Sequence, residues 1–492
     1  MKTTFILSAL LVLSGIRPTP DTRSYTYGHE NVLGTSFDLK VIATSPDIAD
    51  EAELVALYEI DRLDNILSSY KPDSEFNRWQ RSRDTGVSVS SELLEVLTLF
   101  DKWKEKTGGA LNAAVGSGVA LWKEAERVQI MPTSYELQRA SEQINIPHWT
   151  LDPVAQTATH VSAQPLLFNS FVKSYIISKV ATKVMTVPGV TGCVVNIGGD
   201  IVVDGDVQER ISVSDPKADG ENDQPLTILN VNNKAIATSG DYRRGYTINE
   251  QWYGHILDAR TAMPVSHVVS ATVIAPNATD AGALATAFNI LAPEESAELA
   301  KSVPGVSYQI VTRSGMRIES DGWRDFTIED KHTSNVSSIG KAQYEMTVQL
   351  ELARFEGRFR RPFVAVWIED GNKKSIRTLA LWYNKPRWLP DLKRWYSKNR
   401  DNLYNATGSV SSVSSATRSP GRYTLKWDGL NDDAKPVSNG RYTLYIEAAR
   451  EHGTYQLIKQ DFDWNGKSMH MEIKGGVEIT AASIDCHTPT RN

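Results

Sequence analysis

A chain of 492 residues exceeds one ordinary domain and is long enough to bury more than one core. Hydrophobic residues make up 41% and charged residues 23%, the mix of a folded globular protein rather than a disordered or fibrous one. The formal net charge of -6 excludes the strongly basic surface that nucleic-acid binding requires. We therefore expect no nucleic-acid partner.

The first residues have the pattern of a secretory signal peptide. Lys2 precedes the apolar run 5–13, and Ser14 and Gly15 offer small side chains for cleavage. Because the run is shorter than the ~20 residues that span a bilayer, we assign residues 1–20 to a signal peptide, with a buried first strand as the alternative. We expect an exported, periplasmic or cell-envelope protein that associates with a membrane only through a partner. Two cysteines so far apart in sequence define no disulfide framework.

Strand and helix patterns then alternate. Residues 34–43 alternate as a strand, and Asp47 is an N-cap candidate for the helix that follows. The apolar face of this helix comprises Leu54, Leu57, Ile60, Leu63 and Ile66. A second helix is predicted over 91–106, ended by two glycines.

Short strand patterns dominate the middle of the chain. They are expected to form one mixed sheet, interrupted by a helix at 281–291. The predicted strands are 192–197, 201–205, 211–214, 226–231 and 268–274. Residues 25–325 are therefore expected to form an α+β domain.

A polar stretch without an apolar period marks a linker, which we place at 326–342. Beyond it the chain consists almost entirely of strand patterns joined by turns, which predicts an all-β, Ig-like sandwich over 343–485. The expected strands are 344–352, 363–368, 376–382, 422–427 and 441–448.

Two features of this second region have alternative interpretations. The acids of residues 428–433 could hold Ca²⁺ or form a polar hairpin turn, and the turn is favoured. A basic aromatic stretch could dock a partner or pack its tryptophans inward. This stretch contains Trp388, Lys393, Arg394, Trp395 and Lys398.

Six short motifs occur in one order before the linker. They are Leu67-Ser68-Ser69-Tyr70 with Asp73 to Asn77, Thr107-Gly108-Gly109-Ala110, Asn196-Ile197-Gly198-Gly199-Asp200, Thr238-Ser239-Gly240-Asp241-Tyr242, His255-Ile256-Leu257-Asp258 and Leu284-Ala285-Thr286-Ala287. Each motif alone is weak, but their shared order over roughly 34–322 resembles the ApbE-like FAD:protein FMN transferases. The resemblance implies a domain that binds FAD and, with Mg²⁺, transfers FMN to a Ser or Thr hydroxyl of an acceptor flavoprotein, with AMP as the leaving group.

The resemblance also implies roles for individual residues. His255 and Asp258 are the expected catalytic pair at the nucleotide site, and the glycine turn at 198–199 is the expected wall of the FAD site, since glycine admits a ligand closely. The full set expected to bind FAD is Ser69, Tyr70, Lys173, Asn196, Gly198, Gly199, Asp200, Ser239, Gly240, Asp241 and His255. A solvated turn at Asp200, a structural histidine and a helix-surface lysine are the alternatives that the residues alone leave open.

The chain departs from the family pattern at two places. Residues 166–175 stand where the family has Asp-Leu-Gly-Gly-Ile-Ala-Lys-Gly-Tyr, with Lys173 and Tyr175 kept but glycines replaced by Asn169, Ser170 and Ser174. Gly282 stands where the family has an aspartate four residues before the metal-binding threonine, which is Thr286 here. Ser170 and Asp280 are the remaining metal-ligand candidates. Asp280 can substitute only if the helix has not yet begun there, since it is displaced by roughly 200° from position 282 on a helix.

Two functions follow from these observations. The first is an FMN transferase, or a relative that hydrolyses FAD as a pyrophosphatase when no acceptor is present. The second is a non-catalytic FAD-binding or scaffold protein that has lost its metal site.

Overall fold

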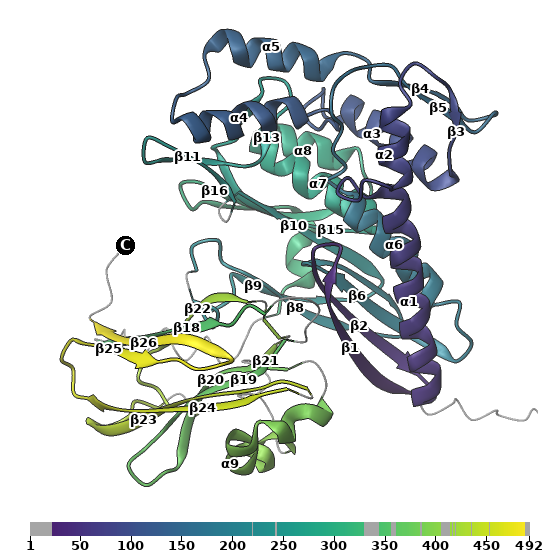
Figure 1. Ribbon diagram of the computed structural model, residues 1–492. Helices are drawn as coiled ribbons and strands as arrows, with labels where there is room; N and C mark the ends of the chain where they lie inside the picture. Colours follow the sequence, from purple (N-terminus) through teal and green to yellow (C-terminus); the bar gives the residue numbers. More distant parts are fainter. Residues whose placement is uncertain are drawn as a thin grey trace, which may run out of the picture.

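The computed structural model describes residues 22–487, apart from 219, 242–243, 329–343, 356–360, 384–385, 405–413, 416, 419, 434 and 452. The expected signal peptide and most of the expected linker lie outside the described residues. Two bodies are visible, an α+β unit and a smaller unit of strands (Figure 1). This agrees with the fold class expected from the sequence.

The α+β unit is built on one large sheet. In the described part of the chain this sheet has eight strands in the order β1-β2-β6-β7-β10-β15-β16-β17. Its strands are β1 (Arg23–Val32), β2 (Thr35–Ala43), β6 (Val190–Ile197), β7 (Asp200–Gly205), β10 (Lys234–Gly240), β15 (Val268–Ala275), β16 (Ser307–Thr312) and β17 (Arg317–Glu319). Every neighbouring pair is antiparallel, so the expected mixed sheet is corrected to an antiparallel one.

Smaller sheets surround the large one. The strands β8 (Glu209–Val213) and β9 (Thr227–Val231), expected to belong to the main sheet, instead form a separate two-stranded sheet. Their apolar side chains pack with Trp323 on one face of the large sheet. The other short strands are β3 (Val87–Ser88), β4 (Trp149–Asp152), β5 (Thr157–His160), β11 (Gly245–Ile248), β12 (Gln251–Gly254), β13 (Leu257–Asp258) and β14 (Met263–Pro264).

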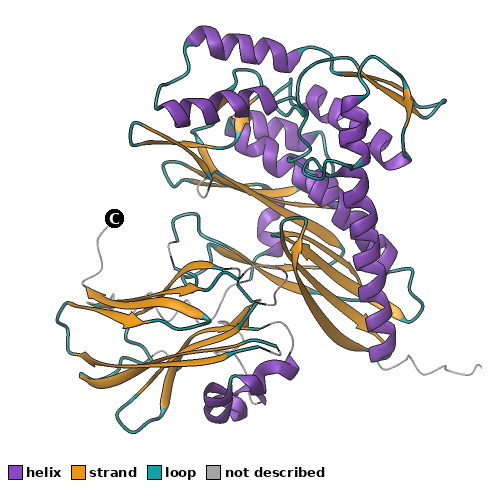
Figure 2. Ribbon diagram, viewed as in Figure 1, coloured by secondary structure: helices purple, strands orange, loops and turns teal. Residues whose placement is uncertain are grey.

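Helices cover the opposite face of the large sheet (Figure 2). They are α1 (Pro46–Leu67), α2 (Glu75–Arg81), α3 (Ser91–Lys106), α4 (Gly116–Val128), α5 (Ser134–Asn145), α6 (Val172–Val184), α7 (Ala278–Ile290) and α8 (Pro293–Lys301), followed by the 3₁₀ helix η1 (Asp321–Phe326). The long α1 lies along the sheet, and α6 and α7 pack on each other above β6, β7, β10 and β15. The motif residues 284–287 lie within α7, and residues 196–200 join β6 to β7, the two strands that α6 contacts.

The first helix differs in two ways from the expected one. Its N-cap is Ser45, whose hydroxyl accepts a hydrogen bond from the Ile48 amide, and Pro46 occupies the first turn, where its missing amide proton costs nothing. Asp47 is therefore inside the helix. Leu54 is 67% exposed, while Ile60 and Leu63 are buried as expected. The buried face also includes three alanines, at 49, 52 and 56, which let the helix lie close to the sheet.

The second unit is the expected sandwich. In the described residues one sheet has the order β22-β18-β26-β25 and the other β21-β20-β19-β23-β24. The strands are β18 (Glu345–Leu352), β19 (Phe363–Glu369), β20 (Ser375–Trp382), β21 (Ser414–Ser415), β22 (Gly421–Trp427), β23 (Gly440–Ala449), β24 (Tyr455–Trp464), β25 (Met469–Lys474) and β26 (Ile479–His487). Their inward side chains form a separate core between the sheets.

The basic aromatic stretch packs inward. It forms the 3₁₀ helix η2 (Pro386–Asp391) and α9 (Lys393–Tyr404), which lie against the outer face of one sheet (Figure 2). The fully buried carboxylate of Glu447 accepts hydrogen bonds from the amides of Arg394 and Trp395, both at 2.8 Å, and so caps the start of α9. Arg394 also pairs with the buried Glu369 at 2.9 Å. These contacts favour the structural interpretation over a docking site.

The polar hairpin after β22 is closed by its own side chains. Asp428 accepts from the Leu430 amide, and Asn431 accepts from the amides of Asp433 and Lys435. These are the bonds of a polar turn, the favoured interpretation of this segment.

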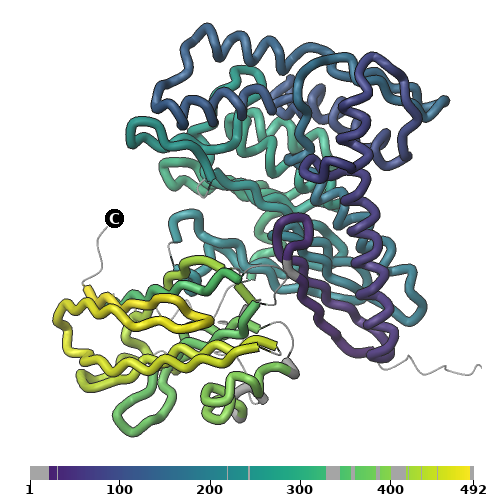
Figure 3. The backbone as a smooth tube through the Cα atoms, in the orientation of Figure 1, coloured from purple at the N-terminus to yellow at the C-terminus, as the bar shows by residue number. Residues whose placement is uncertain are grey.

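The two units meet at the edge strand β22. The Glu221 amide donates to the Thr424 carbonyl at 2.7 Å, and the Asn222 side chain forms two hydrogen bonds with the backbone of Lys426, at 2.7 and 2.8 Å. The ion pair of Arg418 with Glu221, at 3.1 Å, flanks them. A loop of the α+β unit thus covers a sheet edge of the sandwich, and the units lie side by side in the backbone trace (Figure 3).

Candidate functional site

The segment 168–174, which leads into α6, is the hub of the candidate site. The Thr286 hydroxyl of α7 donates to the Ser170 carbonyl oxygen at 3.1 Å. The Ser170 hydroxyl is buried and has no hydrogen-bond partner among the described residues. Two of the three residues expected to bind a metal are therefore in contact.

One helical turn away along α7, Gly282 faces Ser174. A Cβ on Gly282 would lie 2.1 Å from the Ser174 Oγ and 2.8 Å from its Cβ, so no larger side chain fits there without movement of the helices. The Ser174 hydroxyl, fully buried, donates to Asp200 Oδ2 at 2.8 Å. The serine that replaces a family glycine thus occupies the space left by the missing aspartate, and it points to another carboxylate.

Asp200 begins β7 and is half-buried. Burial raises the pKa of its carboxyl, while the positive charge of Lys173 and the Ser174 hydrogen bond act in the opposite direction. Lys173 itself is exposed in the first turn of α6. Lys173 and Asp200, two of the residues expected to bind FAD, therefore lie near each other on the hub.

Asp280 lies elsewhere. The helix α7 begins at Ala278, three residues earlier than expected, with Asn277 as N-cap, so Asp280 is already inside the first turn. The Asn277 side chain donates to the Asp280 carboxylate at 2.7 Å. Because the helix has begun, the condition under which Asp280 would replace a carboxylate at position 282 is not met.

The glycine turn joins β6 to β7. Gly198 and Gly199 have φ of 63° and 97°, which favour glycine, and a Cβ on Gly199 would meet no atom within 4 Å. The Asn196 side chain accepts from the Gly199 amide at 3.0 Å and lies 3.5 Å from Asp38. Asn196 thus holds the turn in shape, while Gly199 leaves open space beside it.

Ser69 and Tyr70 reach the hub from the end of α1. Ser69 accepts a hydrogen bond from the Phe168 amide at 3.1 Å. The Tyr70 ring is 80% exposed, and its hydroxyl donates to the Asn169 side chain at 3.3 Å. An exposed aromatic ring beside the hub offers a surface on which a flat ligand can stack.

His255 has a defined tautomer. Its Nδ1 lies 3.1 Å from the Arg244 carbonyl oxygen, which can only accept, so Nδ1 carries the proton in the neutral ring and Nε2 offers a lone pair. Burial lowers the pKa of His255 and the Arg244 charge adds to this effect, whereas the hydrogen bond to the backbone raises it. The ring is therefore neutral at pH 7.

Asp258 is held by a different set of contacts. Its carboxylate accepts from Arg260, at 2.8 Å to Nη2, and Arg260 also reaches Glu295 at 3.2 Å. In the described chain no hydrogen bond joins His255 to Asp258 or either of them to the hub. These contacts give Asp258 a positioning role in the β13–β14 turn.

The motif at the end of β10 is partly buried in the fold. Asn289 of α7 donates to the Ser239 carbonyl oxygen at 2.9 Å, and Gly240 pairs with Ser270 of β15. Asp241 is fully buried and pairs with Arg313 at 2.8 Å, and burial raises its carboxyl pKa against the Arg313 charge. Asp241 thus links this strand end to β16.

Sequence reasoning did not assign a role to Ser174, Asp38 or Arg313. Ser174 was visible as a replaced glycine, but only the fold shows that it stacks on Gly282. Asp38 and Arg313 belong to no motif and become relevant through Asn196 and Asp241.

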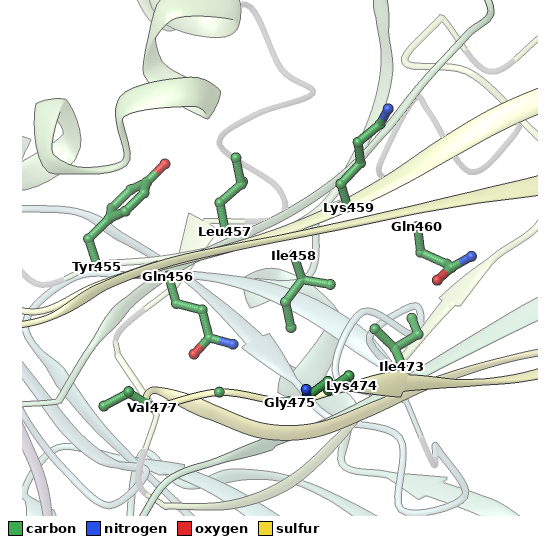
Figure 4. Close-up of a pocket in the computed structure, with 11 residues that line it drawn as sticks. Tyr455, Gln456, Leu457, Ile458, Lys459, Gln460, Ile473, Lys474, Gly475 and Val477 are labelled. Carbon is green, nitrogen blue, oxygen red and sulfur yellow. The ribbon is translucent and has the colours of Figure 1, made fainter.

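A groove of about 490 Å³ lies outside these residues, between the edge strands β24 and β25 of the sandwich (Figure 4). Its walls carry Gln456, Ile458 and Ile473, with Lys459 and Lys474 at the rim. It contains no histidine, carboxylate or cysteine among its lining residues, so the hub in the α+β unit remains the candidate for chemistry.

The fold and the hub define a ligand-binding α+β domain fused to a β-sandwich. The ApbE family model matches residues 33–310, more than half of the chain, and the protein belongs to this family. Residues 345–481 match a second family, DUF2271, described as a predicted periplasmic protein.

Relatives support the assignment. The FAD:protein FMN transferase of Vibrio cholerae is 30% identical over 309 residues, which are 60% of this chain and 89% of that protein. The enzyme of the same name from Haemophilus influenzae is 28% identical over 297 residues, 57% of this chain and 84% of that protein.

Solved structures share the fold. The ApbE protein of Thermotoga maritima has a TM-score of 0.55 and 23% identity, covering 62% of this chain and 100% of that one. The flavinyl transferase ApbE of Pseudomonas stutzeri has a TM-score of 0.52 and 21% identity, covering 62% and 96%. The described helices include none that is both long and apolar enough to cross a bilayer.

Proposed function

We propose that the chain is an FAD:protein FMN transferase. An acceptor Ser or Thr hydroxyl oxygen attacks the phosphorus of the FMN half of FAD, the bond to the bridging diphosphate oxygen breaks, and AMP leaves with that oxygen. The hydroxyl proton passes to a base. Water in place of the acceptor would release FMN and AMP, which is the pyrophosphatase side reaction.

The observation that carries this proposal is the hub at 168–174, which contains Lys173 and where three of the motif segments meet. Tyr70, Asp200 and Thr286 come from different parts of the chain, yet each contacts this segment. The helix α6 starts here without a side-chain cap, and a helix N-terminus with a lysine in its first turn favours a phosphate. The diphosphate of FAD fits this place, with the flavin ring toward the exposed Tyr70 and the open side of Gly199.

His255 is the base that we propose for the transfer. Its Nε2 lone pair is available because Nδ1 is committed to the Arg244 carbonyl, and burial keeps the ring neutral at pH 7. Asp258 acts through the turn that it shares with Arg260, as a positioning residue. We propose that the remaining residues expected to bind FAD line or support the same site; they are Ser69, Asn196, Gly198, Ser239, Gly240 and Asp241.

The oxygen donors at the hub fit a hard cation such as Mg²⁺. The Thr286 hydroxyl, the Ser170 carbonyl and the buried, unpartnered Ser170 hydroxyl are of the type that Mg²⁺ accepts beside substrate phosphate. Within the described residues no three His, Cys, Asp or Glu side chains are grouped to hold a metal. When bound, the cation would neutralise charge on the diphosphate.

The alternative of a non-catalytic FAD-binding protein finds no support among the relatives, which carry the name of an enzyme. The family description of residues 345–481 supports a periplasmic location, and the signal pattern at 1–20 supports export. We infer an exported flavoprotein as the acceptor, and we infer domain limits of 25–325 and 343–485 around the linker 326–342.

A direct test is to incubate the pure protein with FAD and Mg²⁺ and to measure AMP by chromatography, with FAD binding followed separately by flavin fluorescence. His255→Ala should reduce AMP release at least a hundredfold, the range of general-base contributions, with FAD affinity changed less. His267→Ala is the matched control, because His267 Nε2 bonds only the Leu291 carbonyl, and it should keep activity. No FAD binding by the folded protein, or equal losses of binding and turnover in His255→Ala, would contradict the proposal.

A further inference from the structure

Because position 282 has no carboxylate, the proposed cation site needs another source of negative charge. Mg²⁺ is usually held through one or two carboxylates plus substrate phosphate, and the hub residues Thr286 and Ser170 supply only neutral oxygens. Gly282 offers no side chain, and Asp280 is bonded to Asn277 in the first turn of α7. A carboxylate from another element must therefore serve the site if the cation is to bind.

The Ser174–Asp200 pair lies at this place. Ser174 Oγ is 2.1 Å from where a Cβ on Gly282 would stand, and it donates to Asp200 Oδ2 at 2.8 Å. Only the Ser174 hydroxyl thus lies between the Asp200 carboxylate and the space that a side chain at position 282 would fill. The proton of the serine points to Asp200, so its lone pairs remain free to accept a bond from elsewhere.

Ser170 precedes α6 and Ser174 lies inside it, and both contact one face of α7. Gly282 and Thr286 share that face because they are four residues apart, a rise of about 6 Å along the helix. The neutral donors and the Ser174–Asp200 pair therefore border one small region between the helices and β7. Lys173, whose charge acts on Asp200, borders the region from the solvent side.

We propose that Ser174 and Asp200 together replace the lost carboxylate of position 282 as the acidic arm of a divalent-cation site completed by Thr286 and Ser170. The inference rests on the proposed function, because the cation is expected to bind with FAD. Asp200 supplies the negative charge, and Ser174 holds Asp200 in place and contributes its hydroxyl oxygen.

Mn²⁺ is the probe for the test, since its free ion is measured directly by electron paramagnetic resonance. Mn²⁺ is titrated into the protein–FAD complex, and FAD binding is measured separately by fluorescence. Asp200→Asn should weaken Mn²⁺ binding to the FAD complex at least tenfold, a larger factor than its effect on FAD affinity measured without the metal. Asp204→Asn, an acid at the other end of β7, is the matched control and should bind Mn²⁺ as the wild type does.

Relocation of the carboxylate gives a second, independent arm of the test. Ser174→Gly with Gly282→Asp clears the space and restores the aspartate, so the double variant should bind Mn²⁺ more tightly than the wild type. Adding Asp200→Asn to that pair should return the affinity close to the wild-type value. Ser174→Ala, which removes the hydroxyl with almost no change of volume, should weaken Mn²⁺ binding even if Asp200→Asn does not fold.

The outcomes separate this inference from the proposed function. Wild-type Mn²⁺ affinity in Asp200→Asn, loss of affinity in Asp280→Asn instead, or an equal loss of FAD and Mn²⁺ would each overturn the assignment of Asp200. A wild-type protein that binds FAD but no Mn²⁺ would overturn the cation site and leave FAD binding intact. A wild-type protein that does not bind FAD would contradict the proposed function itself.

Discussion

Replacing Gly282 by aspartate alone should destabilise the protein, although the i, i+4 relation to Thr286 suggests from the sequence that it would restore a metal ligand without harm to the fold. The new Cβ would stand 2.1 Å from Ser174 Oγ and 2.8 Å from Ser174 Cβ. A rotation of the serine relieves the first contact but not the second, because Cβ is fixed to the backbone of α6. The helices α6 and α7 must therefore move apart, because a change of rotamer moves neither Cβ atom.

The size of the effect follows from three contributions. Overpacking a core costs about 1–3 kcal/mol, and displacing the Ser174 hydroxyl loses a hydrogen bond to a carboxylate, about 1.5–3 kcal/mol. Removing a glycine from a helix returns at most about 1 kcal/mol. The net loss for Gly282→Asp should be about 1.5–6 kcal/mol. The double variant with Ser174→Gly removes the clash, and its two glycine effects oppose each other, but it still loses the Ser174–Asp200 hydrogen bond, so its net loss should be about 1.5–3 kcal/mol.

The wild type, Ser174→Gly, Gly282→Asp and the double variant form a double-mutant cycle. Differential scanning calorimetry of these four proteins measures the coupling free energy between positions 174 and 282. Gly282→Ala is the control for the steric part, since it adds the same Cβ without a charge. A coupling above about 1.5 kcal/mol is expected for residues in direct contact. Additive effects, or an unchanged melting temperature in Gly282→Asp, would refute the packing on which the reasoning depends.

Three further predictions concern the rest of the molecule. Glu447→Ala should destabilise the sandwich by about 3 kcal/mol or more in calorimetry, because it leaves two amides of α9 without acceptors, whereas Asp463→Ala on the facing strand β24 should change little. Asn222→Ala should speed hydrogen exchange of the Lys426 amide at least tenfold and leave the Met346 amide in β18 unaffected, since only Lys426 loses its acceptor; equal exchange would show that the units do not dock through this loop. The free energy of unfolding should fall as the pH drops below the ordinary histidine pKa of about 6.5. Burial lowers the pKa of His148 in the folded state, so the unfolded chain binds more protons in this pH range. If His148→Gln lost the same amount of stability on acidification, the effect would belong to other groups.

The fold class was predictable because it depends on patterns that a short window contains. The helix α3 runs over the expected residues 91–106, since Ser90 caps it and Gly108 ends it with φ of 57°. The start of α1 was misplaced because Ser45 is a better cap than Asp47 when a proline follows it. Four of the five residues expected on its apolar face pack in or against the core, but Leu54 is exposed, and the alanines of the helix–sheet contact were not detected by a search for large apolar residues.

The sheet shows a second limit. Strand patterns identified β6 to β9 individually, but whether strands pair parallel or antiparallel, and in which sheet, depends on contacts between distant residues. The separate pairing of β8 with β9 follows from their packing on Trp323, far along the chain. No local pattern contains that information.

The candidate site shows the same division. Motif order placed Ser170 and Thr286 in one proposed site, and their side-chain-to-backbone contact agrees with that expectation. The sequence also showed a serine and a glycine where a glycine and an aspartate were expected. The sequence could not show that positions 174 and 282 are in contact. The serine at 174 and the glycine at 282 therefore looked like two unrelated differences from the family, whereas in the structure they compensate each other.

This exchange argues for adaptation rather than decay of the site. Loss of an aspartate from a buried position would leave a cavity and a set of polar neighbours without partners. Here Ser174 fills the space beside Gly282, and its hydroxyl is hydrogen-bonded to Asp200. Position 282 therefore shows neither a cavity nor an unpaired Ser174 hydroxyl. One turn further along α7, beside Thr286, the Ser170 hydroxyl is buried without a partner among the described residues. This is expected of a polar group that forms its hydrogen bond or metal contact only when a ligand binds. Loss of the site alone would not explain why the space at Gly282 is filled while the Ser170 hydroxyl stays buried without a partner in the described chain.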